Sequence, residues 1–91
     1  MAKTTLGAKR LAAEMTKRDI SFQKAADELS TYGTPTVRYS VWQWSHGKSK
    51  PNMAHAFAME SWSAGRIPAE SWSTYNEEGC KKLQESRRSR V

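Results

Sequence analysis

The sequence predicts an all-α fold of about five short helices, two of them joined by a long turn, with a flexible basic C-terminal tail. Three observations favour this fold. Apolar residues recur three and four positions apart in several short segments, good N-cap residues precede those segments, and glycines follow two of them. The chain has 91 residues, of which 37% are hydrophobic, so it has room for one small core. We therefore expect one domain over residues 1–75 and a tail over residues 76–91.

The first two helices have the spacing of amphipathic helices. Residues 5–17 place three apolar side chains on one face, namely Leu11, Ala12 and Met15. Three charged side chains fall largely outside that face: Lys9, Arg10 and Glu14. Ser21 is a good N-cap for a second helix, whose apolar stripe consists of Phe22, Ala25, Ala26 and Leu29. The two adjacent alanines would let another helix approach closely.

A third helix is expected over residues 35–45. Residues 30–36 are dense in turn formers and predict a loop. Thr34 followed by Pro35 has the pattern of an N-cap with proline at the first helical position, and Gly47 would end the helix. At 100° per residue, one face carries Val37, Val41 and Trp44, with Ser40 beside them. The other face carries Arg38, Tyr39, Trp42 and Gln43.

A fourth helix is expected over residues 53–64, between the N-cap Asn52 and the terminating Gly65. Its predicted buried stripe consists of Ala54, Phe57, Ala58 and Trp62. A fifth, short helical turn would begin at Ile67 and Pro68 and contain Trp72.

The segment after Tyr75 has few hydrophobic residues. Five basic residues lie in it: Lys81, Lys82, Arg87, Arg88 and Arg90. This composition predicts either a mobile arm or a helix that becomes ordered on a partner.

The charge balance points to a polyanionic partner. There are 15 Lys and Arg against 9 Asp and Glu, which is typical of proteins that bind nucleic acid or a membrane surface. No acidic residue lies between Glu28 and Glu60. The chain has no run of eighteen apolar residues and no apolar signal core at its N-terminus. Its single cysteine, Cys80, suits a reducing compartment, so we expect a cytoplasmic protein without membrane association.

The outward face of the third helix has the residue types that read base pairs in duplex DNA. Arginine can bond guanine O6 and N7, and glutamine can bond adenine N6 and N7, which predicts base contacts for Arg38 and Gln43. Base contacts are also predicted for Tyr39, which could alternatively donate to a phosphate, and for Trp42, which could alternatively pack against the helix flank or the loop. Contacts to the DNA backbone, where positive charge strengthens binding without reading sequence, are predicted for Lys48 and Lys50, and also for Thr36.

The stretch from Val41 to Pro51 resembles the end of the recognition helix in the Cro/CI-like family of helix-turn-helix repressors. The matching residues are Val41, Trp44, Gly47, Lys48, Lys50 and Pro51. Residues 20–29 are similar to the family's second helix, and residues 55–72 are similar to small phage and prophage regulators. The likeness covers roughly residues 8–72. In this chain the turn between the second and third helices is longer by about five residues than the family's. Phe22 stands where the family tends to place a glutamine that touches a phosphate, so the resemblance implies a backbone contact for the next residue, Gln23.

Metal, cofactor and enzyme functions are not predicted. His46, His55 and Cys80 do not have the spacing of a structural zinc site. There is no glycine-rich phosphate loop, and one small core leaves no room for a shielded catalytic cleft.

The resemblance implies a transcriptional regulator that binds double-stranded DNA, specifically a dimeric phage-type repressor acting in a bacterial host cell and associated with the nucleoid. Two copies would place their third helices in successive major grooves about 34 Å apart. Two alternatives stay open: an architectural, excisionase-like factor that bends DNA, and an antitoxin-like module that binds a protein partner through its C-terminal tail.

Overall fold

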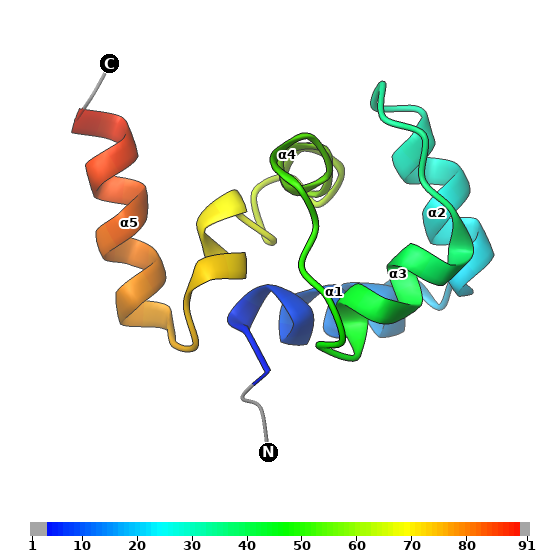
Figure 1. Ribbon diagram of the computed structural model, residues 1–91, viewed down its shortest axis with the longest axis horizontal. Coiled ribbons are helices and arrows are strands. Elements are labelled where there is room, and N and C mark those ends of the chain that lie inside the picture. The colour runs from blue at the N-terminus through cyan, green and yellow to red at the C-terminus, as the bar shows by residue number, and fades with distance from the viewer. Residues whose placement is uncertain (1–3, 90–91) are drawn as a thin grey trace.

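The computed structural model describes residues 4–89, and this part of the chain is helical, as predicted. Its elements are α1 (Leu6–Arg18), α2 (Phe22–Ser30), α3 (Arg38–Ser45), α4 (Met53–Trp62), the 3-10 helix η1 (Ala69–Ser73) and α5 (Glu77–Ser89). Figure 1 shows α2 and α3 at one end of the molecule, α5 at the other, and α4 and η1 between them. No helix in residues 4–89 is long and apolar enough to cross a bilayer.

The N-caps explain where three of the helices begin. The side chains of Thr5, Ser21 and Asn52 each accept a hydrogen bond from a backbone N–H three residues later, at 3.2, 3.1 and 2.9 Å. Ser21 and Asn52 are therefore the caps that the sequence predicted. Gly47, with a φ value of +70°, follows the C-cap of α3 and ends this helix in a conformation that other residues rarely adopt. After the C-cap of α4 the first left-handed residue is Ala64, with a φ value of +55°, and Gly65 follows it at +87°.

One core joins the first four helices and η1. It contains Leu11 and Met15 from α1, the alanine pair and Leu29 from α2, and large aromatic side chains from later elements. The other members are Ala8, Val41, Trp44, Ala56, Met59, Trp62, Ile67 and Trp72. Because α3 buries Val41 and Trp44 in this core, its remaining side chains are held in fixed directions relative to α1 and α2.

The third helix begins three residues later than the sequence predicts, and Thr34 is not its N-cap. In a helix that began at Pro35, the carbonyls of Pro35 and Thr36 would accept hydrogen bonds from N–H groups one turn later. In the structure those carbonyls lie 3.0 Å from His55 Nε2 and 3.2 Å from Ser30 Oγ. Ser30 Oγ also accepts from the Thr36 N–H at 3.0 Å. The loop is thus fixed by side chains outside α3, and Val37, which we expected in the core, is 63% exposed.

Four further predictions about burial are wrong. On α1, Ala12 is exposed and Glu14 is buried. On α4, Ala58 and Trp62 are buried as predicted, but Ala54 and Phe57 are exposed, and Ala56 and Met59 are buried in their place. The stripe on α4 is rotated because this helix packs on both η1 and α2, so its buried surface is not the single face that a period of 3.6 residues assumes.

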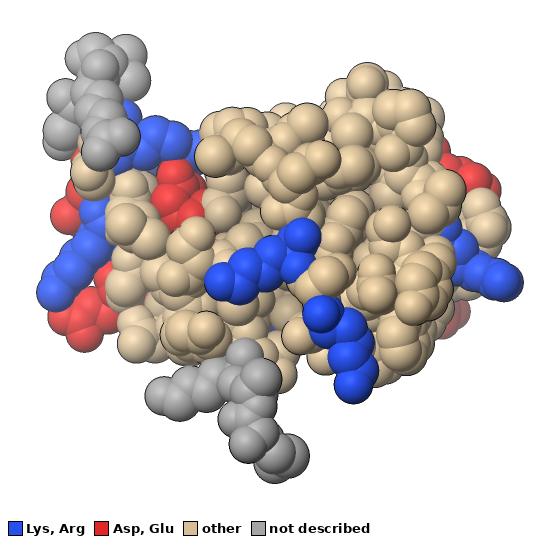
Figure 2. All heavy atoms as spheres, in the orientation of Figure 1, with Lys and Arg blue, Asp and Glu red and all other residues tan. Residues whose placement is uncertain are grey.

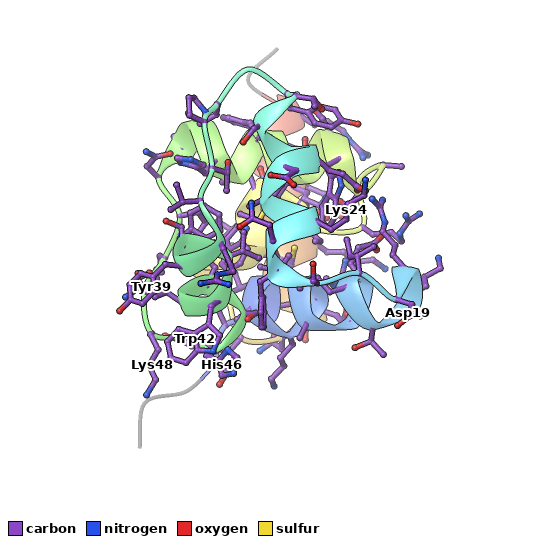
Figure 3. All side chains as sticks on the ribbon, turned by 90° about the vertical axis from the view of Figure 1, so that its right-hand side faces the viewer. Asp19, Lys24, Tyr39, Trp42, His46 and Lys48 are labelled. Carbon is purple, nitrogen blue, oxygen red and sulfur yellow. The ribbon has the colours of Figure 1, made fainter. Side chains whose placement is uncertain are left out.

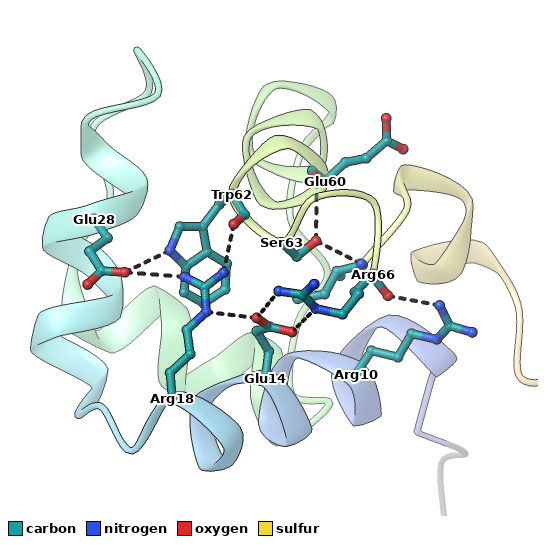
Figure 4. A network of polar contacts seen from close by, with 9 residues as sticks. Arg10, Glu14, Arg18, Glu28, Glu60, Trp62, Ser63 and Arg66 are labelled. Atoms are coloured by element: carbon teal, nitrogen blue, oxygen red, sulfur yellow. Dashed lines mark hydrogen bonds and ion pairs between the residues drawn. The ribbon is translucent and has the colours of Figure 1, made fainter.

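The buried Glu14 is the centre of a polar network that joins α1, α2 and the end of α4 (Figure 4). Its carboxylate accepts two hydrogen bonds from Arg66, both at 2.8 Å, and one from Arg18 at 2.7 Å. Arg18 also donates to the Trp62 carbonyl at 2.8 Å and lies 4.2 Å above the Trp62 ring. The indole N–H of Trp62 donates to Glu28 at 2.9 Å. The hydrogen bonds from the two arginines lower the pKa of Glu14 from its ordinary value of 4.5 to about 2.

The C-terminal segment is not a mobile arm over its described residues. Residues 77–89 form α5, which packs on η1. Arg87 makes ion pairs with Glu60 at 3.0 Å and Glu70 at 2.8 Å, and Cys80 is buried, which raises the pKa of its thiol. The helix is therefore held by contacts with the rest of its own chain. The predicted basic residue Arg90 lies outside the described residues.

Candidate nucleic-acid interface

The outward face of α3 carries the four side chains that the sequence predicted there. Arg38 and Tyr39 are exposed, and Trp42 and Gln43 are half-buried. The helix can present them because Val41 and Trp44, which alternate with them, are anchored in the core. Arg38 has no ion-pair or hydrogen-bond partner among residues 4–89, so its guanidinium is available to a ligand.

A row of stacked rings runs along this face. Tyr39 and Trp42 are stacked with ring centroids 6.0 Å apart, and Trp42 and His46 are stacked at 4.5 Å. Phe22, at the start of α2, extends the row: its centroid lies 6.1 Å from that of His46, and its ring is tilted by 49° to the imidazole. The stacking of Tyr39, Trp42 and His46 favours one arrangement of their rings, which reduces the entropy that this surface would lose on binding.

Hydrogen bonds within α3 further orient the row. Gln43 Nε2 donates to the hydroxyl of Tyr39 at 3.4 Å. His46 Nδ1 lies 2.9 Å from the carbonyl oxygen of Trp42. Nδ1 also lies 3.1 Å from the hydroxyl oxygen of Ser45. Both contacts use Nδ1, and Nε2 has no hydrogen-bond partner within residues 4–89. His46 is therefore a candidate contact residue that the sequence reasoning missed. It lies four positions after Trp42, and continuing the outward face by one more turn would have found it.

Positive charge lies at the C-terminal end of the row. Figure 3 shows Tyr39, Trp42, His46 and Lys48 on one side of the molecule, with Asp19 and Lys24 on the other. Lys48 and Lys50 are both exposed. Figure 2 shows the molecule in the orientation of Figure 1. Lysine and arginine side chains lie among uncharged residues in the middle of that view, and acidic residues lie only near its left and right edges. The arrangement suits a polyanionic ligand.

Two of the predicted backbone contacts are in less favourable surroundings. The hydroxyl of Thr36 donates to the Thr34 carbonyl at 2.9 Å, so its proton is already used within the loop. Gln23 is exposed at the start of α2 but donates to Asp27 at 2.9 Å, and a carboxylate beside it disfavours an approaching phosphate.

A shallow groove of about 530 Å³ adjoins the row where α1, α2 and α3 meet. Apolar and polar side chains line it together, including Phe22 and His46 from the row and the acidic Asp19. The acidic Asp19 makes this groove a poor site for a phosphate. The charged part of the candidate interface is therefore the end of α3 and the segment that follows it, and the groove is not part of it.

The described residues hold no group of three or more His, Cys, Asp or Glu side chains that could bind a metal ion. The groups with displaced pKa values also lie elsewhere: Glu14 is on α1, Arg66 follows α4, and Cys80 is on α5. What the surface offers is a rigid set of hydrogen-bonding, aromatic and cationic side chains.

No protein-family model, curated protein or solved structure matches this chain. The resemblance to Cro/CI-like regulators therefore rests on the sequence motif alone.

Proposed function

We propose that this protein is a sequence-specific regulator of transcription that binds double-stranded DNA through α3 and acts as a dimeric, phage-type repressor. The observation that carries the proposal is the division of α3 into two faces. Val41 and Trp44 are held in the core. Arg38, Tyr39 and Gln43 lie on the other face, in a stretch of the chain that has no acidic residue. A recognition helix needs this division, because it must be rigidly supported while its outer face enters the major groove.

The chemistry of the outward face supports duplex reading. Base edges in the major groove are distinguished by their hydrogen-bond donors, acceptors and methyl groups, and α3 offers a guanidinium, an amide and a phenol within two turns. Lys48 and Lys50 follow directly and would lie close to the phosphates. In this proposal the phosphates supply most of the affinity and the side chains of α3 supply the sequence preference. A bound dimer would block polymerase at an overlapping promoter.

Replacing Arg38 with alanine should relax the sequence preference at one base position in each half-site. Loss of a bidentate contact to guanine costs about 1–3 kcal/mol at that position. The measurement is selection from a random duplex library at near-physiological salt, with the wild type and the variant in parallel. We expect the wild type to enrich an inverted repeat whose half-sites lie about one helical turn apart.

Arg88→Ala is the matched control, because Arg88 is an exposed arginine on α5, at the opposite end of the molecule from α2 and α3. It should enrich the same motif as the wild type. Salt-sensitive binding without any enriched motif would contradict a sequence-specific repressor and favour the architectural alternative.

Replacing Lys48 with alanine should weaken binding to all sequences to a similar extent. One phosphate contact fewer reduces the slope of log K against log salt concentration by about 1. The measurement is fluorescence anisotropy on one selected duplex and one scrambled duplex between 50 and 200 mM salt. Lys82→Ala on α5, where the side chain is 75% exposed, serves as the charge-matched control. An unchanged slope for Lys48→Ala would place this lysine outside the interface.

The antitoxin-like alternative has lost one of its supports, since the segment expected to fold on a protein partner is already ordered on the domain as α5. The long loop before α3 is compatible with the architectural alternative. Measuring the bend angle of bound DNA separates that alternative from a repressor.

A further inference from the structure

Val37 is a large aliphatic residue in an unusual position. It is the N-cap of α3, it has extended backbone angles (φ −111°, ψ 154°), and its side chain makes no capping hydrogen bond. It is 63% exposed. The two residues after it, Arg38 and Tyr39, are the first members of the outward face and are also exposed.

Folding alone does not account for a valine at this position. Valine is among the poorest N-cap residues, and serine, threonine, aspartate or asparagine would satisfy a free N–H of the first turn. The other four α-helices have Thr5, Ser21, Asn52 and Asn76 at this position, and each of these side chains accepts a hydrogen bond from a backbone N–H three residues later. An exposed residue that departs from a local folding rule is a candidate for a functional role.

The backbone at Val37 is held in place from both sides. Thr36, immediately before it, is bonded through its N–H to Ser30 Oγ at 3.0 Å. The carbonyl of Val37 itself accepts from the N–H groups of Ser40 and Val41, at 3.1 and 3.3 Å. The exposed isopropyl group therefore has a fixed position at the N-terminal end of α3, which is the end of a recognition helix that contacts bases.

We propose that Val37 contacts the C5-methyl group of a thymine in the major groove. This inference rests on the proposed function. An aliphatic side chain can neither donate nor accept a hydrogen bond, and the thymine methyl is the apolar group that the base edges present in that groove. Val37 would thus set a thymine preference beside the base pair read by Arg38.

The test replaces thymine with deoxyuridine, which lacks only the methyl group, one position at a time in the duplex that the wild type selects most strongly. Burial of one methyl group corresponds to about a fourfold difference in Kd. We expect one position in each half-site at which deoxyuridine weakens wild-type binding by that factor. Val37→Ser should bind the duplex with thymine at this position and the duplex with deoxyuridine there with equal affinity.

Val37→Thr is the matched control, because threonine and serine can both cap the helix but only threonine keeps a methyl group. Both variants should unfold at a higher urea concentration than the wild type, since each supplies the missing cap. The threonine variant should retain a preference for thymine, and the serine variant should not. A loss of discrimination in a more stable protein separates a base contact from a structural effect.

Two results would overturn the inference. If Val37→Ser discriminates thymine from deoxyuridine as the wild type does, or if the wild type does not discriminate at any position, Val37 is not a methyl contact. In either case a selected motif that Arg38→Ala still relaxes would leave the proposed function standing. Failure of the wild type to select any motif would overturn the inference and the proposed function together.

Discussion

Replacing Glu14 with glutamine is expected to lower the free energy of unfolding by about 3 kcal/mol at pH 7, because removing one partner of a buried ionic network leaves the other charges uncompensated. Glu14 accepts three hydrogen bonds from Arg18 and Arg66. A glutamine amide would direct N–H groups at guanidinium N–H groups in the same space. Small domains have roughly 5–15 kcal/mol of stability in total, so this one change would remove a large share.

The same carboxylate predicts how stability depends on pH. Its pKa is about 2 in the folded protein and 4.5 ordinarily, so the folded state favours the charged form. The stabilisation is therefore fully present above pH 4.5 and is lost as the pH falls from 4.5 to about 2. A pKa difference of that size corresponds to about 3 kcal/mol in the free energy of unfolding. Urea unfolding of the wild type and Glu14→Gln between pH 7 and pH 2.5 measures both effects.

Glu78→Gln is the control for this experiment. Glu78 is 82% exposed and pairs with Lys82 at 3.8 Å on the surface of α5, and exposed pairs of this kind contribute about 0.5 kcal/mol or less. If the stability of Glu14→Gln falls with pH as steeply as that of the wild type, the Glu14 network does not account for the acid sensitivity.

Glu14 also illustrates why the sequence predicted α1 only in part. The spacing of Leu11 and Met15 correctly identified an amphipathic helix, and the rule that charged residues face solvent placed Glu14 outside its buried face. That rule fails where a carboxylate has enough partners to be buried. The decisive partner, Arg66, lies 52 residues away, and a pattern of local periodicity contains no information about it.

The predictions for the start of α3 and for the C-terminal segment were wrong for the same kind of reason. Local turn chemistry favoured a helix from Pro35, but its carbonyl lies against His55, 20 residues later. The sparse hydrophobic content of residues 76–91 favoured a mobile arm or a helix ordered on a partner, but Arg87 forms ion pairs with Glu60 and Glu70 of the same domain. In both cases a long-range polar contact overrides a local preference. Periodicity and composition contain no information about such contacts.

The candidate interface was more predictable than these features, since it depends mainly on helical geometry. Burial of Val41 and Trp44 determines the direction of every other side chain on α3, so Arg38 and Tyr39 could be placed on the outward face from spacing alone. The ring row was only partly predictable. Phe22 joins it from another helix, and Val37 is exposed because the helix begins after it.

Replacing Gly7 with alanine is expected to destabilise the protein by about 2 kcal/mol, because overpacking a tightly filled core typically costs 1–3 kcal/mol. A Cβ atom at Gly7 would lie 2.5 Å from Cδ2 of Trp72 and 2.8 Å from two further atoms of that ring. Alanine normally stabilises a helix interior relative to glycine by about 1 kcal/mol. The expected sign is therefore the reverse of what helix propensity alone predicts.

The contact between α1 and η1 can be isolated with Trp72→Leu, which removes the ring from the path of the new Cβ. The indole N–H of Trp72 is buried and has no hydrogen-bond partner in the described part of the chain, so leucine also removes an unsatisfied donor. In this background Gly7→Ala should be neutral or stabilising by up to about 1 kcal/mol. Urea unfolding of the four proteins, followed by circular dichroism, gives the coupling energy of the pair. A coupling near zero would mean that the backbone of α1 shifts to accept the Cβ, and that the close approach at Gly7 does not hold α1 against η1.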